Sequence, residues 1–395
     1  MALLESVRVR AYRSARDVEL RLGPVTALVG EARSGKSNLL RAVRALLDPE
    51  APPLRREDLP GRARTVTVEA TLAGGGRIDL TATPPEPARA SRRGAPPALF
   101  LPALHRSGPL LDPDGHSRAT DEAVERFRAA LGGATAARSS STGASALIAG
   151  VEACHETGVA GVVFLIEEPE LFLRPQTQRY LYRRLRALAA AGNQVLYSTH
   201  APAFLNVARL EELVLVRHSA RRGTHVVQPQ PLEADEAFRI VSEFDAERSE
   251  LFLARSVILV EGRTEKLVLP SIFAALGHDA DNAQVSVVEC GGKSNIPVFA
   301  RICKACRIPF VVVHDRDAGP GEQPIPAEIE LNRLIASIAG RARTIVLEPD
   351  FEGVTGLRGH SNKPERAWEH FTSPGVEVPE PLARTVDIAL EAAAR

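Results

Sequence analysis

Two pairs of acidic residues in the second half of the chain each follow a predicted strand. The apolar run VILV at 257–260 precedes Glu261 and Glu265, and FVVV at 310–313 precedes Asp315 and Asp317. Apolar β-branched runs of this length are typical of buried strands in a parallel sheet. Ligands bind at the carboxyl ends of such strands, so the two pairs can converge although they lie far apart in the chain. Four oxygen ligands suit Mg²⁺ or Mn²⁺, and the residues therefore predict a divalent-metal site.

A phosphate-binding motif lies near the N-terminus. Residues 30–37 read GEARSGKS, with the strand-like VTALV before them and the helical SNLLRAVRALL after them. This matches G-x-x-x-x-G-K-[ST] in its required context, with Gly30 and Gly35 as the motif glycines. Backbone N–H groups of such a loop cradle phosphates. We expect Lys36 to reach the β and γ phosphates of ATP and Ser37 to hold Mg²⁺.

Two more strand ends carry residues suited to ATP hydrolysis. The segment GVVFLIEEPE at 161–170 places Glu167 and Glu168 after a buried strand, and QVLYSTH at 194–200 ends in His200. The position of Glu167 suits a Mg²⁺-coordinating acid, and that of Glu168 suits the general base that activates water on the γ-phosphate. Because His200 follows the acidic pair at another strand end, it is better interpreted as a site residue than as a structural histidine.

Glu261 in VEGRTE, with Asp315 and Asp317 in HDRD, resembles the Toprim domain of topoisomerases, primases and some nucleases. The intervening GGKSNI and the upstream RSELFLARSVILVEG narrow the resemblance to the OLD (overcoming lysogenization defect) family of ATP-dependent nucleases. The resemblance implies an α/β fold, with an ABC-type P-loop ATPase domain followed by a Toprim domain built on a flavodoxin-like parallel sheet. It does not cover the segment from about 51 to 131 or the end of the chain after Thr372.

The resemblance also assigns roles to further residues. His200 in STHAPAFL matches the switch histidine that senses the γ-phosphate. At the position of Glu167, most relatives have Asp instead. Ser141 and Gly143 occupy the place of the ABC signature, which meets the nucleotide of a partner subunit. Lys363 would assist cleavage. Acids after the strand in TIVLEPDFEG would help to bind a second metal, and the candidates are Glu348, Asp350 and Glu352.

The predicted domains are an ATPase at 1–245, a Toprim nuclease at 246–372 and a C-terminal tail with a short helix at 373–395. The boundary is placed near Asp245, in a polar helical segment. Asp315 and Asp317 are expected to point the same way, because alternate residues of a strand share a face. Lys293, after the predicted turn at Gly291 and Gly292, could contact phosphate.

Composition excludes some classes of protein. No run of eighteen apolar residues is present, so a membrane span is not expected, and the N-terminus lacks a signal peptide's apolar block. A cytoplasmic location is expected. The net charge is zero, so a DNA site must be a local patch. Cys303 and Cys306 have the spacing of half a zinc site, or they pack as small hydrophobes on a buried helix face.

The sequence thus predicts an ATP-binding and ATP-hydrolysing enzyme that cuts or nicks DNA with divalent metal ions. ATP would gate cleavage, two ATPase heads would form a homodimer, and a helicase-like or other protein partner is conceivable. Phage defence or DNA repair is the role that the resemblance implies. The alternative is a non-cleaving, ATP-gated DNA clamp or sensor. A topoisomerase would need a nucleophilic tyrosine, and all four tyrosines lie in the ATPase half (Tyr12, Tyr180, Tyr182 and Tyr197).

Overall fold

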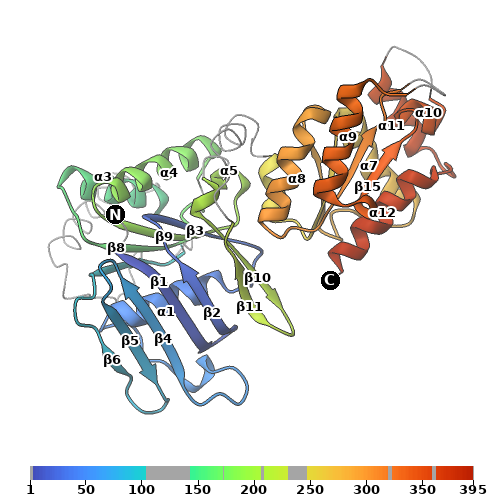
Figure 1. The fold of residues 1–395 in the computed structure, drawn as a ribbon. Helices are drawn as coiled ribbons and strands as arrows, with labels where there is room; N and C mark the ends of the chain where they lie inside the picture. The colour runs from blue at the N-terminus through green and yellow to red at the C-terminus, as the bar shows by residue number, and fades with distance from the viewer. Residues whose placement is uncertain are drawn as a thin grey trace. The chain divides into compact units, whose positions relative to one another are not determined.

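A computed structural model describes residues 3–103, 143–171, 173–205, 209–229, 247–318, 323–357 and 362–394. The chain divides into two compact units, Met1–Pro231 and Leu232–Arg395 (Figure 1). The predicted boundary near Asp245 lies outside the described residues and stays a prediction.

The first unit is built on an eleven-stranded mixed sheet with the order β6-β5-β4-β1-β2-β11-β10-β3-β9-β8-β7. One half is antiparallel, with β1 Leu4–Tyr12, β2 Ala15–Arg21, β4 Val66–Leu72, β5 Arg77–Ala82 and β6 Arg89–Ser91. The other half is parallel, with β3 Val25–Val29, β7 Ala98–Leu101, β8 Val163–Glu167 and β9 Gln194–Thr199. The hairpin of β10 Leu213–Ser219 and β11 Gly223–Val227 joins the halves. The described helices of this unit are α1 Lys36–Leu47, α3 Gly143–Glu156, α4 Pro175–Ala190 and α5 Pro202–Leu205.

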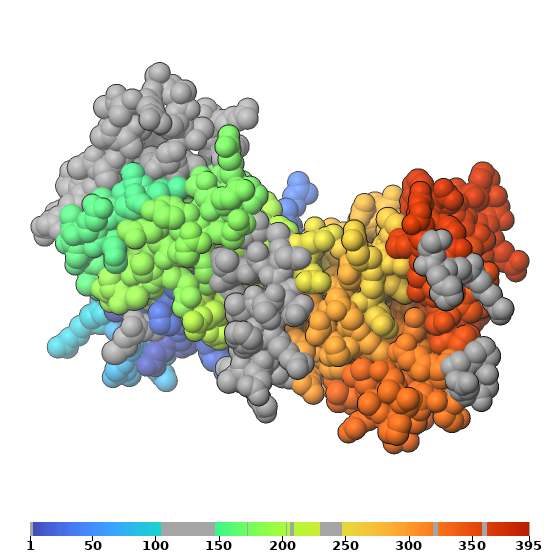
Figure 2. Space-filling model, turned by 90° about the horizontal axis from the view of Figure 1, so that it is seen from above, coloured from blue at the N-terminus to red at the C-terminus, as the bar shows by residue number. Residues whose placement is uncertain are grey.

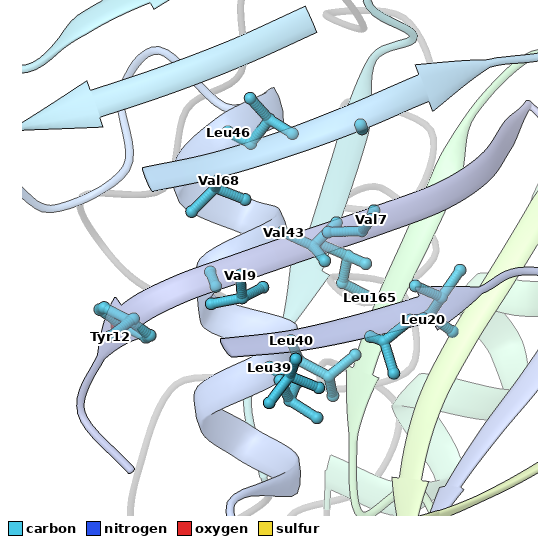
Figure 3. Close-up of a cluster of buried hydrophobic side chains, with 14 of the residues drawn as sticks. Val7, Val9, Tyr12, Leu20, Leu39, Leu40, Val43, Leu46, Val68 and Leu165 are labelled. Carbon is cyan, nitrogen blue, oxygen red and sulfur yellow. The ribbon is translucent and has the colours of Figure 1, made fainter. Parts of the chain in front are cut away.

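Helix α1 packs its apolar face onto this sheet (Figure 3). Its leucines and valine recur at the spacing of one helical face, which is why the segment after the P-loop forms an amphipathic helix. This packing fixes the N-terminal end of α1, and with it the P-loop, against the ends of the central strands. The labelled contact residues on α1 are Leu39, Leu40, Val43 and Leu46, and those on the strands include Val7, Val9, Leu20, Val68 and Leu165.

The second unit is a four-stranded parallel sheet with the order β13-β12-β14-β15 and helices around it (Figure 1). The predicted α/β fold with a parallel Toprim-type sheet is confirmed. The strands are β12 Ser256–Val260, β13 Val285–Glu289, β14 Phe310–Asp315 and β15 Thr344–Leu347. The helices are α7 Arg263–Ala275, α8 Ile296–Ala305, α9 Pro326–Ala339, α10 Phe351–Thr355, α11 Lys363–Thr372 and α12 Glu380–Ala393.

The segment after Thr372, which was predicted as a tail with a short helix, carries helix α12. Helix α12 places Leu382, Val386 and Ala389 in the same buried cluster as Ile258 of β12. In the space-filling view the C-terminal residues, in red, lie directly against earlier parts of this unit (Figure 2). The helix therefore completes the core on one face of the sheet.

The four cysteines are buried, and Cys303 lies on the buried face of α8. The burial of Cys303 and Cys306 agrees with their interpretation as small hydrophobic residues packed at a helix. No group of three or more His, Cys, Asp or Glu that could hold a metal ion occurs in the described parts of the chain, so the zinc alternative gains no support. Among the described helices, none is long and apolar enough to cross a membrane.

Candidate nucleotide and metal sites

The P-loop lies between β3 and α1, as predicted. Lys36 begins α1 and is only 5% exposed. Its Nζ donates hydrogen bonds to the carbonyl oxygens of Gly30 at 2.6 Å and Glu31 at 2.8 Å. Burial lowers the pKa of Lys36, against the opposing effect of Glu168 and other nearby carboxylates. Loop carbonyls therefore hold the ammonium group inside the loop, and Ser37 follows it in the first turn of α1.

Side chains from two hairpins brace the loop from behind. Gly35 has a φ of 107°, and a Cβ at this position would lie 2.1 Å from Thr224 Oγ1, so the motif needs glycine here. Thr224 Oγ1 lies 2.8 Å from the Ser34 carbonyl oxygen and 2.7 Å from Ser14 Oγ. Asn38 Nδ2 also donates to Ser14 Oγ, at 2.8 Å. Sequence reasoning missed these bracing residues, because Ser14 lies in the turn between β1 and β2 and Thr224 lies in β11, and neither belongs to a motif.

The two acids that follow β8 have different partners. Glu167 is buried, and its carboxylate pairs with Arg41 Nε of α1 at 3.2 Å. A role of Glu167 as a Mg²⁺ ligand would compete with this ion pair. Glu168 lies beside His200, with Oε1 at 3.4 Å from Nδ1, because β8 and β9 are parallel neighbours that end together. The structure therefore brings the predicted general base and the switch histidine to one edge.

Glu170 is a candidate that sequence reasoning did not single out. It is 3% exposed, and its Oε1 accepts hydrogen bonds from Thr199 Oγ1 at 2.7 Å and from the His200 N–H at 3.1 Å. Burial raises the pKa of Glu170. Its carboxylate therefore fixes the backbone that carries His200. Ser141 lies outside the described residues and Gly143 begins α3, so the predicted signature stays a prediction.

In the second unit, the acids that follow β12 and β14 meet at the carboxyl edge of the sheet. Glu261 comes directly after β12, Glu265 lies in the first turn of α7, and Asp315 is the last residue of β14. Glu261 Oε2 is buried and has no hydrogen-bond partner among the described residues. Burial, followed by repulsion from Glu265 and Glu261, raises the pKa of Asp315 to about 7. Burial also raises the pKa of Glu261 and of Glu265. The surroundings of these three carboxylates therefore disfavour their negative charges.

Asp317 is oriented differently from the prediction. Its φ is 59°, so the strand alternation ends before it. Its Oδ2 lies 2.5 Å from Lys293 Nζ, and the same ammonium pairs with Glu328 Oε2 at 2.9 Å. The lysine that was expected to contact phosphate is thus bound within the acidic cluster. Glu328, on α9, gave no signal in the sequence.

The three acids after β15 do not act as one group. Glu352 pairs with Lys363 Nζ at 2.8 Å. Burial opposes the charge of Lys363, but Glu352 and the nearby Glu265 raise its pKa. Asp350 instead caps α10, accepting a hydrogen bond from the Gly353 N–H at 2.7 Å, and Glu348 lies 3.6 Å from Arg316. Of these three described acids, Glu352 is therefore the one that interacts with the acidic edge, together with its partner Lys363, whereas Asp350 caps a helix.

The donor chemistry at this edge fits a divalent cation. Glu261, Glu265 and Asp315 offer hard oxygen ligands, one of them a buried oxygen without a partner, and their mutual repulsion would be relieved by a cation. As the described side chains stand, they do not form a ready group of three ligands. Binding would therefore require these carboxylates to turn toward a shared ion.

Comparisons with known proteins match both units. The family model "Overcoming lysogenization defect protein-like, TOPRIM domain" matches residues 252–317, and "AAA domain, putative AbiEii toxin, Type IV TA system" matches residues 84–206. An OLD nuclease of Thermus scotoductus is 38% identical over 248 residues, which cover 57% of this chain and 47% of that protein. The Old nuclease of Escherichia phage P2 is 26% identical over 168 residues, covering 41% and 29%. The matches span less than half the length of either relative.

Two solved structures are also similar. An SMC head bound to the C-terminal winged-helix domain of ScpA has a TM-score of 0.43 at 13% identity, covering 60% of this chain and 100% of that one. The C-terminal region of the Xanthomonas campestris pv. campestris OLD protein has a TM-score of 0.28 at 18% identity, covering 37% and 96%.

Proposed function

We propose that this chain, which belongs to the OLD family of ATPase–Toprim proteins, is an ATP-dependent nuclease that cleaves DNA with the help of Mg²⁺ or Mn²⁺. The observation that supports this most directly is the edge of the second unit's parallel sheet. There Glu261, Glu265 and Asp315 gather with raised pKa values and with Lys363 beside them. A structural acidic rim has no reason to bury carboxylates that repel one another.

Glu261, Glu265 and Asp315 would hold the cation. When bound, a divalent ion at such a site polarises a phosphodiester and lowers the pKa of a bound water. Lys363 pairs with Glu352 at 2.8 Å near Glu265 and Asp315, and its side chain is 34% exposed, so its ammonium could also contact a phosphate. The Asp315 carboxylate is fixed by the Phe351 N–H, which donates to Oδ1 at 2.9 Å. These residues would orient the scissile group, and the second metal site stays a prediction.

The first unit would bind and hydrolyse ATP. The loop carbonyl oxygens accept hydrogen bonds from Lys36. They would hold its ammonium group where the β and γ phosphates approach such a loop. Glu168 would take the proton from the attacking water, and its neighbour His200 would contact the γ-phosphate. Phosphodiester hydrolysis is favourable without ATP, so we expect ATP to gate cleavage and not to drive it. Dimerisation through the ATPase heads, a helicase-like partner, and a role in phage defence or DNA repair belong to the same proposal.

Conversion of supercoiled plasmid to nicked or linear DNA tests the proposal. The purified protein is incubated with Mg²⁺ or Mn²⁺, with and without ATP, beside Asp315→Asn, Lys36→Ala and, as a control, Asp387→Asn on the exposed side of α12. We expect cleavage that Asp315→Asn abolishes, that Asp387→Asn preserves and that ATP changes only when Lys36 is present. Intact ATP hydrolysis without cleavage under either metal would instead favour the clamp or sensor.

A further inference from the structure

The loop after β13 ties together the two strand ends that carry the metal-site acids. Gly292, at a φ of 123° that favours glycine, donates its N–H to the Glu261 carbonyl oxygen at 2.9 Å. The next residue, Lys293, donates from Nζ to the Asp315 carbonyl oxygen at 2.8 Å. Because β12 and β14 are neighbours in the sheet, this one loop sets where Glu261 and Asp315 stand relative to each other.

The ammonium group of Lys293 has no donor left for a substrate. The side chain is 5% exposed, and Nζ lies within 2.9 Å of three acceptors. A lysine ammonium has three N–H donors, so each donor has its own acceptor. A substrate phosphate would therefore have to displace a buried partner. The three acceptors are the Asp315 carbonyl oxygen, Asp317 Oδ2 and Glu328 Oε2.

We infer that Lys293 is a positioning residue of the metal site and not a phosphate contact, with Glu328 of α9 as its anchor. The inference rests on the proposed function, because Lys293 can position metal ligands only if this edge of the sheet binds a metal ion. The ammonium neutralises Asp317 and holds the end of β14 in place. The negative charges of Glu261, Glu265 and Asp315 thereby remain for an added cation to neutralise. Partners that orient metal ligands commonly change metal affinity about 10- to 100-fold when removed.

Binding of Mn²⁺, followed by electron paramagnetic resonance without ATP or DNA, provides a readout that does not depend on catalysis. We expect Lys293→Met to weaken Mn²⁺ binding about tenfold or more and to shift the Mn²⁺ concentration for half-maximal cleavage by the same factor. The KM for DNA should stay nearly constant. Glu328→Gln should act in the same direction but more weakly. Lys304→Met, an exposed lysine of α8, is the matched control and should change nothing.

Three results would overturn the inference. Unchanged Mn²⁺ binding with a raised KM for DNA would identify a phosphate contact, and tighter Mn²⁺ binding in Lys293→Met would show that the ammonium competes with the metal. Wild-type protein that binds no Mn²⁺ would remove the site itself. If Lys293→Met does not fold, Glu328→Gln decides the question. Protein that binds Mn²⁺ without cutting DNA would refute the proposed nuclease, while the comparison of Mn²⁺ binding would still test Lys293.

Discussion

Replacing Asp315 by Asn should stabilise the metal-free protein while destroying the metal site. Asn keeps an oxygen acceptor for the Phe351 N–H, but it removes the charge that burial, Glu265 and Glu261 disfavour. The pKa of Asp315 rises from 3.8 to about 7 on folding. At a pH between these two pKa values, the Asp315 carboxyl group is therefore mostly protonated in the folded state and mostly ionised in the unfolded state. The stabilisation from Asp315 is complete below the lower value and is lost as the pH rises through about 7.

The size of this effect follows from the shift. Roughly three pKa units at about 1.4 kcal/mol each give an upper bound of about 4 kcal/mol. Asp315 is only partly buried and its carboxylate can relax toward water, so we expect Asp315→Asn to raise the free energy of unfolding by about 2 kcal/mol near pH 8. Near pH 5, between the two pKa values, the difference should shrink to less than half of its value at pH 8, or to roughly 1 kcal/mol or less, and it should vanish only below about pH 4.

Trp368 makes the measurement specific to the second unit. It is the chain's one tryptophan and lies on α11, so its fluorescence during urea unfolding follows this unit. Added Mn²⁺ should stabilise the wild type but not Asp315→Asn, and the order of the two stabilities should reverse. Asp387→Asn should leave the wild-type behaviour unchanged. The reasoning fails if Asp315→Asn is less stable than the wild type at pH 8, or if their difference is the same at both pH values.

Three further predictions concern other parts of the chain. Lys36→Ala should abolish ATP hydrolysis and leave Mn²⁺ binding without nucleotide intact, and a joint loss of both would contradict separate sites. Thr224→Val removes the hydroxyl that lies between Ser34 and Ser14, so ATP affinity in equilibrium binding should fall between about two- and tenfold, whereas an unchanged affinity would mean that β11 does not shape the P-loop. Leu382→Ala should lower the stability of the second unit by about 2–5 kcal/mol in the Trp368 fluorescence assay, and wild-type stability would show that α12 is not part of its core.

The sequence predicted those site residues that follow directly from strand ends. Parallel strands end at one edge, so the apolar runs before Glu168, His200, Glu261 and Asp315 were enough to place these residues in two groups. This rule does not predict which side chains pair with one another. Glu170 looked like any acid after a strand, and only the fold shows that it is buried against the Thr199 hydroxyl and the backbone of His200.

The end of the second unit shows a different limit. Asp317 was assigned to the same face as Asp315 by strand alternation, but its left-handed backbone turns it toward Lys293. That pairing depends on a loop from another part of the chain, and no local pattern predicts it. A short helix was predicted in the segment that carries α12, but its packing was not, although Leu382, Val386 and Ala389 recur at helical spacing and are buried.

The acidic residues of the two units are neutralised by different sources of positive charge. In the first unit the buried carboxylate of Glu167 is paired with Arg41, a cation that the chain itself supplies. ATP brings its own magnesium ion, so this unit gains little from a free ion when nucleotide is absent. In the second unit burial, followed by the charges of neighbouring carboxylates, raises the pKa values of Glu261, Glu265 and Asp315. The stabilisation of this protein by free divalent ions should therefore belong to the second unit, and the first unit should respond to such ions only together with ATP.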